Sequence, residues 1–317
     1  MEPPARSEPP RAPPGPRPIH IDTDPGLDDL LALALALASP ELELRSLSTV
    51  AGNASLAAVT ENALRFLALA RCSLPVGRGA EGPLALRRTD ATAFHGPDGR
   101  RRMVLPQPAP IRLSCAREQL AESLRQGVRS LVALGPLTNL AALWLETPDL
   151  LAGVELIWMG GTLGQGNVTP HAEFNAYADP KAAALLLGAG LRIRVVGLEV
   201  TTRVRVGFQD LAGGCFGSGP IGRTLEEMLR ALCAAEAPDR AAVLHDPCAV
   251  AAAVRPEAFR FERVPLEVHV AEDARRGCLR RAPKGATVEY AREVEAESVR
   301  DLVLRRLAEW SDKLDAY

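Results

Sequence analysis

The hydrophobic and polar positions of this chain form short apolar runs that alternate with longer segments of helical periodicity. The apolar runs predict β-strands over 19–23, 44–50, 130–134, 154–159 and 192–197, and helices follow over 28–38, 55–70, 137–146 and 178–189. Strands that alternate with helices indicate βαβ units. We therefore expect an α/β fold with an open, mainly parallel, Rossmann-like sheet flanked by helices, which binds ligands beyond the carboxyl ends of its strands.

The chain is predicted to hold one domain after a short tail. It has 317 residues, of which 47% are hydrophobic, enough for a sizeable core. Residues 1–17 are rich in Pro, Arg and Glu, which predicts a disordered tail, and 18–317 contain no evident linker, which predicts a single domain. The apolar run over 30–38 is far shorter than the roughly 20 residues that a membrane span needs, so no membrane partner is expected.

Charge and cysteine usage narrow the class of protein further. The net charge of −2 gives no excess that would favour nucleic acid or an acidic membrane surface. The longest basic run, Arg100-Arg101-Arg102, is predicted to be a solvated loop. Six cysteines occur without a C-x-x-C pair, a pattern of neither a disulfide framework nor a zinc site. Reduced thiols and a cytoplasmic location are therefore expected.

One segment concentrates negative charge between two apolar elements. The sequence Asp22-Thr23-Asp24-Pro25-Gly26-Leu27-Asp28-Asp29 holds four carboxylates and no basic residue. Burying like charges without partners is costly, and a divalent cation with oxygen ligands would resolve the conflict. The alternative is helix capping, with Asp24 as N-cap and Pro25 at the first helical position. Capping accounts for one or two of the acids, so we interpret the segment as a metal site.

Further polar motifs follow other apolar runs. His245-Asp246-Pro247 lies far downstream, and Asp246 becomes informative if the fold brings it to the same cation. In extended conformation Glu173 and Asn175 would point to one face and Phe174 to the other, an arrangement suited to gripping vicinal hydroxyls. An ordinary polar loop is the alternative. Weaker signals, which also fit turns or a helix cap, are Ala51-Gly52-Asn53, Gly135-Pro136-Leu137-Thr138-Asn139 and His95-Gly96.

Taken in order, these motifs resemble the nucleoside hydrolase family of the inosine-uridine preferring type. The resemblance rests on DTDPGLDD at 22–29, AGN at 51–53, HG at 95–96, GPLTN at 135–139, MGG at 159–161, GN at 166–167, EFN at 173–175, DP at 179–180 and HDP at 245–247. It covers roughly residues 18 to 310 and implies hydrolysis of the N-glycosidic bond of ribonucleosides to base and ribose, with Ca²⁺ at the strand ends.

The resemblance also implies residue roles. The metal ligands would be Asp24, Asp29, Asp246 and the main-chain carbonyl of Thr138. Asp28 matches the general base, Asp22 a supporting acid, and His245 the general acid for the leaving base. The substrate-binding residues would be Asn53, His95, Asn167, Glu173 and Asn175. A homo-oligomer, dimer or tetramer, is expected from the resemblance, and the partner is a small-molecule nucleoside with no nucleic acid.

The chain departs from the family pattern around the base. The segment 203–244 contains Phe208 and Phe216 but no Tyr or Trp for stacking, and Glu199 stands where the family has Asp. Arg100–Arg102 replaces small apolar residues, and Arg240 is predicted to face solvent. Two alternatives remain open at this point. One is a nucleoside- or ribose-binding protein without turnover, and the other is an Asp-nucleophile phosphatase of the haloacid dehalogenase type, which also begins with Asp-x-Asp after a first strand.

Overall fold

The computed structural model describes residues 15–85, 92, 96–101, 103–108, 111–212, 214–236 and 240–316. The strands are β1 (Arg17–Thr23), β2 (Leu42–Thr49), β3 (Val76–Arg78), β4 (Ser114–Cys115), β5 (Ser130–Ala133), β6 (Glu155–Met159), β7 (Arg192–Val196), β8 (Arg205–Gly207), β9 (Ala241–Val243), β10 (Phe259–Val268), β11 (Leu279–Arg281) and β12 (Ala286–Val294). The α-helices are α1 (Leu27–Ala38), α2 (Leu56–Leu69), α4 (Ala116–Arg125), α5 (Thr138–Glu146), α6 (Phe174–Ala178), α7 (Pro180–Leu187), α8 (Leu198–Thr201), α9 (Pro220–Ala235), α10 (His245–Val254) and α11 (Ala296–Asp315). Every strand and helix predicted from the pattern is present, with ends shifted by a few residues.

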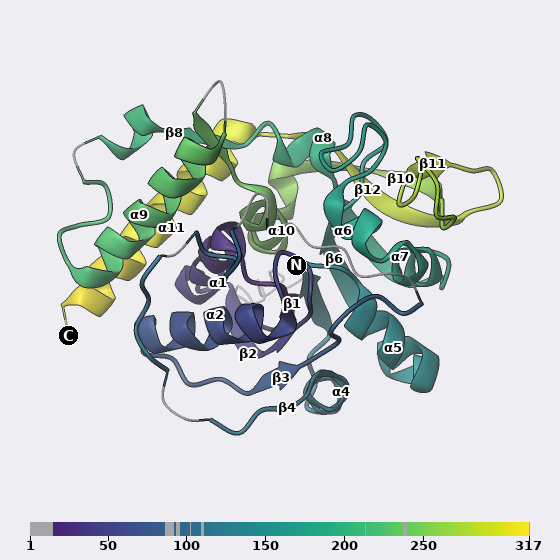
Figure 1. Cartoon of the computed structure of the whole chain (residues 1–317), viewed down its shortest axis with the longest axis horizontal. Coiled ribbons are helices and arrows are strands. Elements are labelled where there is room, and N and C mark those ends of the chain that lie inside the picture. The colour runs from purple at the N-terminus through teal and green to yellow at the C-terminus, as the bar shows by residue number, and fades with distance from the viewer. Residues whose placement is uncertain are drawn as a thin grey trace, which may run out of the picture.

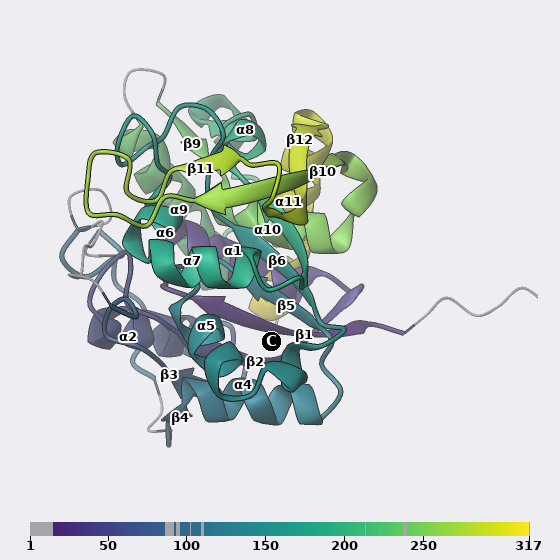
Figure 2. The ribbon, with the colours of Figure 1, turned by 90° about the vertical axis from the view of Figure 1, so that its right-hand side faces the viewer.

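A ten-stranded sheet forms the centre of the molecule. Its order is β11-β10-β12-β7-β6-β5-β1-β2-β3-β4, and only the pairings of β10 with β11 and β12 are antiparallel. Figure 2 shows these three strands at one edge of the sheet, with β3 and β4 near the other. The expected open, mainly parallel α/β fold is therefore confirmed. A separate two-stranded sheet pairs β8 with β9.

Helices cover both faces of this sheet. On one face α1, α9, α10 and α11 pack together around the cluster that contains Ile19 and Ile21. On the other face α4, α5 and α7 pack over a second apolar cluster that contains Trp158 (Figure 1). Strands buried on both faces read as continuous apolar runs, which explains why periodicity identified them. Among the described residues, no helix is both long and apolar enough to cross a membrane.

The connection between β10 and β11, at the antiparallel edge of the sheet, helps to position α6. Arg276, in the connection between β10 and β11, is buried and donates from Nε to the Tyr177 carbonyl at 2.9 Å and from Nη2 to the Ala178 carbonyl at 3.1 Å. These carbonyls belong to the C-terminal turn of α6, where backbone acceptors lack intrahelical donors. The connection therefore fixes the C-terminal end of α6 against the sheet.

The start of α1 differs from the capping prediction. The helix begins at Leu27, with Gly26 in extended conformation as the N-cap, so Asp24 and Pro25 precede the helix. The Gly26 N–H donates to Asp29 Oδ2 at 2.9 Å, so the cap is supplied from inside the first turn. The alternative interpretation of Asp24 as N-cap was wrong because Gly26 occupies that position and Asp29 accepts its N–H. Asp24 is left to interact with residues after β2.

Candidate active site

The acidic segment lies where β1 ends and α1 begins. Asp22 is the penultimate residue of β1, Asp24 follows the strand, and Asp28 and Asp29 lie in the first turn of α1. All four are buried, and none exposes more than 8% of its surface. Four carboxylates therefore meet in an environment where their ionised forms are poorly solvated.

Asp246 joins this segment from the far end of the chain. It is the second residue of α10, which packs against α1. One oxygen from each of Asp28, Asp29 and Asp246 lies within 4.8 Å of the other two. Asp24 lies outside that trio, although its carboxylate interacts electrostatically with Asp28 and Asp29. The structure thus places Asp28, predicted as the base, among the carboxylates that could hold a metal.

The electrostatics of this cluster favour a cation. Asp22 Oδ2, Asp24 Oδ1 and Asp28 Oδ1 are buried oxygens that accept no hydrogen bond. Burial raises the pKa of Asp24 and of Asp246 well above the usual range, and the neighbouring carboxylates raise both further. Hard divalent cations bind several carboxylate oxygens at once. The donor set therefore fits a divalent ion such as Ca²⁺.

Two glycines allow Asp24 to occupy its place. A Cβ at Gly52 would lie 2.0 Å from Asp24 Oδ2, and a Cβ at Gly135 would lie 2.5 Å from Asp24 Oδ1. Asn53 fixes both carboxylates, because its backbone N–H donates to Asp24 Oδ2 at 2.7 Å and its amide donates to Asp29 Oδ2 at 3.0 Å. Asn53, predicted to bind substrate, thus also orders the acidic loop.

Thr138 begins α5 beside this cluster. Its hydroxyl donates to Asp179 Oδ2 at 2.8 Å, and Asp179 Oδ1 caps α7 by accepting from Ala182 N at 3.0 Å. This contact ties the start of α5 to the junction of α6 and α7. The side chain of Thr138 is therefore structural, and the role of its main-chain carbonyl stays a prediction.

A buried polar chain beneath Asp22 was missed from the sequence. Asp22 Oδ1 accepts from the Ser48 hydroxyl and from Asn139 Nδ2, the latter at 2.8 Å. The ring of His20 lies between Ser48 Oγ at 2.8 Å and Ser46 Oγ at 2.7 Å. Burial lowers the pKa of His20 to about 3 and raises that of Asp22 to about 7. The sequence held a signal for this chain of contacts. Ser46 and Ser48 are two residues apart on β2 and lie opposite His20 and Asp22, which are two residues apart on β1.

A cavity of about 550 Å³ opens above the acidic cluster at the carboxyl ends of the strands. Seven of the predicted site residues line it: Asp28, Asn53, Asn167, Glu173, Asn175, His245 and Asp246. Asp24, Asp29 and Thr138 are not among its lining residues, and His95 lies outside the described residues. The structure therefore gathers most of the predicted substrate-binding residues around one space.

Glu173 and Asn175 hold the cavity wall in a different way from the extended geometry predicted. Glu173 is the N-cap of α6, and its carboxylate accepts from the backbone N–H groups of Gly161 at 2.6 Å and Asn175 at 2.8 Å. Asn175 lies inside α6 and donates to the carbonyls of Leu134 at 2.7 Å and Met159 at 3.0 Å, at the ends of β5 and β6. The extended prediction was wrong because Glu173 caps a helix, but both side chains still reach the cavity.

The apolar part of the cavity also differs from expectation. Phe174, predicted to point away from Glu173, lines the cavity with Val168, and its N–H donates to Asn167 Oδ1 at 3.0 Å. Phe216 is fully buried in the core, and neither it nor Phe208 is a lining residue. The aromatic surface beside the site therefore comes from Phe174, which the sequence interpretation had assigned to the opposite face.

His245 lies at the first position of α10 and lines the cavity beside Asp246. Its Nδ1 is 2.8 Å from the Thr201 hydroxyl at the end of α8, a contact that fixes the ring. Arg205 and Glu236, which the sequence did not single out, bring opposite charges to the same cavity. Arg240 is exposed, as predicted, and its guanidinium stacks over Phe208 at 5.1 Å.

Glu199 departs from the family pattern for a structural reason. Its Oε1 accepts from Leu163 N at 2.7 Å, and its Oε2 accepts from the Tyr290 hydroxyl on β12. A Cβ at Gly197 would lie 2.3 Å from that hydroxyl oxygen. Glu199 therefore links the loop after β6 to Tyr290, and the absence of a side chain at Gly197 leaves room for the Tyr290 hydroxyl.

Comparison with known families and proteins agrees with this geometry. The model of the inosine-uridine preferring nucleoside hydrolase family matches residues 19–301. A curated relative, the non-specific ribonucleoside hydrolase RihC of Escherichia fergusonii, is 34% identical over 314 residues, covering 93% of this chain and 99% of its own. The pyrimidine-specific ribonucleoside hydrolase RihA of Escherichia coli is 37% identical over 251 residues, covering 76% and 81% of the two chains.

Solved structures give the same result. A plant nucleoside hydrolase, the PpNRh1 enzyme, superposes with a TM-score of 0.85 at 32% identity, over 92% of this chain and 99% of its own. A purine-preferring ribonucleoside hydrolase from Gardnerella vaginalis superposes with a TM-score of 0.88 at 25% identity, over 94% and 100%. The relatives differ in the bases that their names specify, so base preference has to be argued from this chain's own residues.

Proposed function

Because the chain belongs to the inosine-uridine preferring nucleoside hydrolase family, and is thus an N-glycosyl hydrolase of ribonucleosides, we propose that it does this chemistry with Ca²⁺ at the acidic cluster. The observation that carries the proposal is the meeting of Asp28, Asp29 and Asp246 at a cavity, with buried oxygens of Asp24 and Asp28 that accept no hydrogen bond. Membership of this family gives no support to the two alternatives from the sequence, a haloacid dehalogenase-type phosphatase and a binding protein without turnover.

The carboxylates divide between holding the ion and accepting a proton. Asp24, Asp29, Asp246 and the Thr138 carbonyl are the proposed ligands, and Asp28 is the proposed base because it lines the cavity and keeps one oxygen without a hydrogen bond. Bound Ca²⁺ would orient a water molecule and ease its deprotonation. Asp28 then accepts the proton as water attacks the anomeric carbon.

The remaining residues bind the substrate and assist departure of the base. N-glycoside hydrolysis passes through an oxocarbenium-like transition state, as O-glycoside hydrolysis does. Glu173, Asn175, Asn167 and Asn53 would hold the ribose hydroxyls, and their hydrogen bonds to the backbone fix them beforehand. His245 is the proposed general acid, with its ring held by Thr201.

A reducing-sugar assay over inosine, uridine, cytidine, adenosine and guanosine tests the proposal. We expect ribose release from at least one nucleoside, loss of release after chelation, and recovery with Ca²⁺. Asp246→Asn should be inactive with or without added Ca²⁺. Activity that survives complete chelation would disprove the metal requirement, and absence of ribose release by the metal-loaded protein would disprove the reaction.

The cytoplasmic location and the dimeric or tetrameric state remain predictions. Fractionation of cells that express the chain, and light scattering of the purified protein, measure them directly.

A further inference from the structure

Asn175 reaches the cavity from a helix that is too short to hold its own position. That helix, α6, has only five residues, and helices this short are not stable on their own in water. The two Nδ2 hydrogens of Asn175 are donated to the carbonyls of Leu134 and Met159, so its amide oxygen is the atom that the side chain can offer to a ribose hydroxyl. The place of that oxygen therefore depends on contacts that fix α6 from outside.

Arg276 holds the C-terminal end of this helix from the connection between β10 and β11, residues 269–278. Its side chain exposes 4% of its surface. Nε donates to the Tyr177 carbonyl at 2.9 Å, Nη2 donates to the Ala178 carbonyl at 3.1 Å, and the guanidinium carbon lies 4.8 Å from the centre of the Tyr177 ring. One planar group thus binds the two carbonyls that end α6 and packs on one of its side chains.

The connection itself is folded tightly around Arg276. Nη1 of Arg276 donates to Glu272 Oε2 at 3.0 Å, and the Gly277 N–H donates to the His269 carbonyl at 2.9 Å. Gly277 has φ +75, and a Cβ there would lie 2.5 Å from the Cα of Tyr177. The turn therefore lies directly on the backbone of α6, at a distance that only glycine allows.

The strand that follows reaches the support of the other end of α6. Leu279, the first residue of β11, packs against Gly161, where a Cβ would lie 2.4 Å from Leu279 Cδ2. The Gly161 N–H donates to Glu173 Oε2 at 2.6 Å, and Glu173 caps the start of α6. Figure 2 shows β10 and β11 beside α6. The antiparallel edge of the sheet thus contacts the supports of both ends of this helix.

We propose that Arg276 is a positioning residue for ribose binding, because its hydrogen bonds to the last turn of α6 set where Asn175 lies between the ends of β5 and β6. The inference rests on the proposed ribonucleoside substrate and adds a residue outside the cavity to its recognition. The proposed base and metal ligands lie on or beside α1, α5 and α10, so the effect falls on ribose affinity.

Inhibition by free ribose, measured on the full chain with Ca²⁺, tests this assignment. Arg276→Ala should raise the inhibition constant of ribose about 10-fold, equivalent to about 1.4 kcal/mol, and KM of the cleaved nucleoside by a similar factor. Because the proposed base and metal ligands keep their places, kcat should change by less than about 3-fold. An unchanged inhibition constant of ribose in Arg276→Ala would overturn the proposal.

Two further variants show whether Arg276 acts through Asn175. In the Asn175→Ala background, Arg276→Ala should raise the inhibition constant of ribose by less than about 3-fold, because the contact that it positions is gone. Arg276→Lys keeps the charge without the planar group that reaches both carbonyls, so its inhibition constant should lie between those of the wild type and Arg276→Ala. If Arg276→Ala does not fold, Arg276→Lys carries the test. An undiminished effect in the absence of Asn175 would contradict the assignment.

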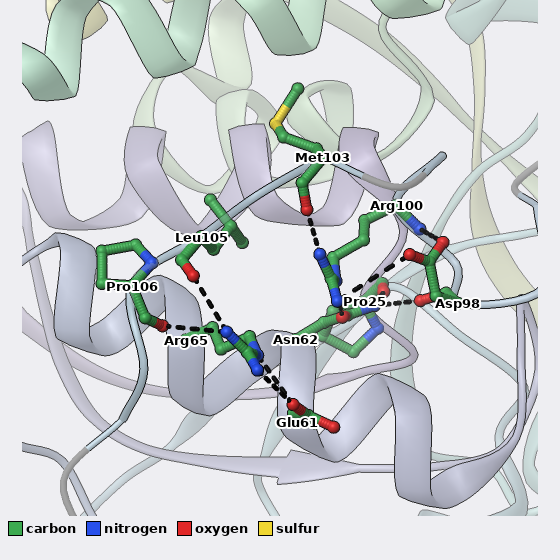
Figure 3. A network of polar contacts seen from close by, with 9 residues as sticks. All are labelled: Pro25, Glu61, Asn62, Arg65, Asp98, Arg100, Met103, Leu105 and Pro106. Carbon is green, nitrogen blue, oxygen red and sulfur yellow. Dashed lines mark hydrogen bonds and ion pairs between the residues drawn. The ribbon is translucent and has the colours of Figure 1, made fainter.

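Arg65 of α2 offers a matched control, because it makes the same kind of contacts without touching α6. Its side chain exposes 12% of its surface and pairs with Glu61, four residues earlier, as Arg276 pairs with Glu272. It donates to the carbonyls of Leu105 at 2.9 Å and Pro106 at 3.4 Å (Figure 3). Arg65→Ala should lower Tm while leaving the inhibition constant of ribose unchanged. A rise as large as that in Arg276→Ala would show that lost stability is sufficient, and would overturn the proposal.

Arg100, also drawn in Figure 3, is unsuitable as a control. Its Nε donates to Asn62 Oδ1 at 2.9 Å, and it also donates to the Met103 carbonyl. Asn62 Nδ2 in turn donates at 2.9 Å to the carbonyl of Pro25, the residue after Asp24, so the loss of Arg100 would loosen the acidic loop. The prediction that Arg100 belongs to a solvated basic run was wrong, because its polar atoms bind the chain around it.

The proposed function and this inference fail in different ways. Absence of ribose release by the wild type disproves the reaction, and calorimetric binding of ribose, weakened about 10-fold by Arg276→Ala, then decides on the inference. A wild type that binds no ribose overturns it.

Discussion

One carboxylate oxygen of Asp28 and one of Asp246 lie within 4.8 Å of each other at the cavity, although Asp28 belongs to α1 and Asp246 to α10. Two carboxylates at this separation stay together by sharing a proton or a cation. A proton and a divalent cation should therefore compete for the carboxylate pair of Asp28 and Asp246.

Added Ca²⁺ should stabilise the protein more at high pH than at low pH. Burial raises the pKa of Asp246 and Asp24. The native state without metal therefore loses stability as pH rises from the ordinary carboxyl value through the raised one. The proposed Ca²⁺ would bind the ionised carboxylates, so the stabilisation that it gives would grow as pH rises. Thermal melts with Ca²⁺ or chelator should show a larger rise in Tm at about pH 8 than at about pH 6. Asp246→Asn should abolish the difference.

Asn substitutions at Asp24 and Asp28 should separate the base from the ligand. Asp28→Asn should lower kcat by about 10²- to 10⁴-fold, as expected for loss of a general base, with Ca²⁺ affinity within a few-fold of the wild type. The main effect of Asp24→Asn should be a lower Ca²⁺ affinity. Calorimetry and ribose release measure the two quantities independently. If Asp28→Asn loses the ion and Asp24→Asn keeps it, the two roles are exchanged.

Gly52→Ala and Gly135→Ala should disturb the cation site without unfolding the chain. Each added methyl group would fall within 2.5 Å of an Asp24 carboxylate oxygen. We expect Asp24 to be displaced and Ca²⁺ affinity to fall at least about 10-fold, since first-sphere geometry controls affinity. Circular dichroism should be unchanged. Wild-type affinity in both variants would show that the Asp24 carboxylate is dispensable for binding.

His245→Ala should affect leaving groups unequally. A nucleobase departs better when protonated, so kcat for nucleosides should fall by about 10²- to 10⁴-fold. A p-nitrophenyl riboside, whose phenolate leaves unprotonated, should lose little. Thr201→Val removes the hydroxyl that fixes the ring and should give a smaller loss in the same direction. An equal loss on both substrates would exclude proton donation by His245.

Asp22→Asn should make the protein sensitive to acid. The depressed pKa of His20, about 3, contributes stability above the ordinary value of 6.5 that is lost as pH falls. The raised pKa of Asp22, about 7, acts in the opposite sense, because it favours the native state as pH falls towards 3.8. Between the ordinary pKa values of Asp22 and His20, 3.8 and 6.5, the two contributions to the free energy of unfolding cancel. The variant keeps only the first, so urea unfolding should show a loss of about 1.4 kcal/mol per pH unit between about pH 6 and pH 4. The double variant His20→Asn, Asp22→Asn should lose this slope.

The sequence predicted the parallel part of the fold because strands such as β5 and β6 are buried on both faces and appear as plain apolar runs. The acidic loop was equally visible, since four carboxylates between apolar elements need compensation. The roles of β10 to β12 and of Arg276 were not predicted, because a buried arginine that binds α6 carbonyls has no local sequence pattern.

Local conformation produced the remaining errors. Glu173 and Asn175 were expected in extended conformation with their side chains on one face, but the Glu173 carboxylate accepts from backbone N–H groups and caps the start of a helix. Arg100 was expected in solvent, but its partner Asn62 lies on another element. In both cases a side chain binds the backbone or a distant amide, and such pairings depend on tertiary contacts that periodicity does not report.

The packing of α1 against α10 has a consequence for how the chain matures. The acids of the first helix are synthesised early, whereas Asp246 leaves the ribosome only after more than two hundred further residues. If the proposed Ca²⁺ is held by Asp24, Asp29 and Asp246 together, an emerging chain lacks one of these ligands through most of its synthesis. A cation that requires Asp246 as a ligand would then bind completed chains in preference to unfinished ones, and its binding would require the packing of α10 against α1.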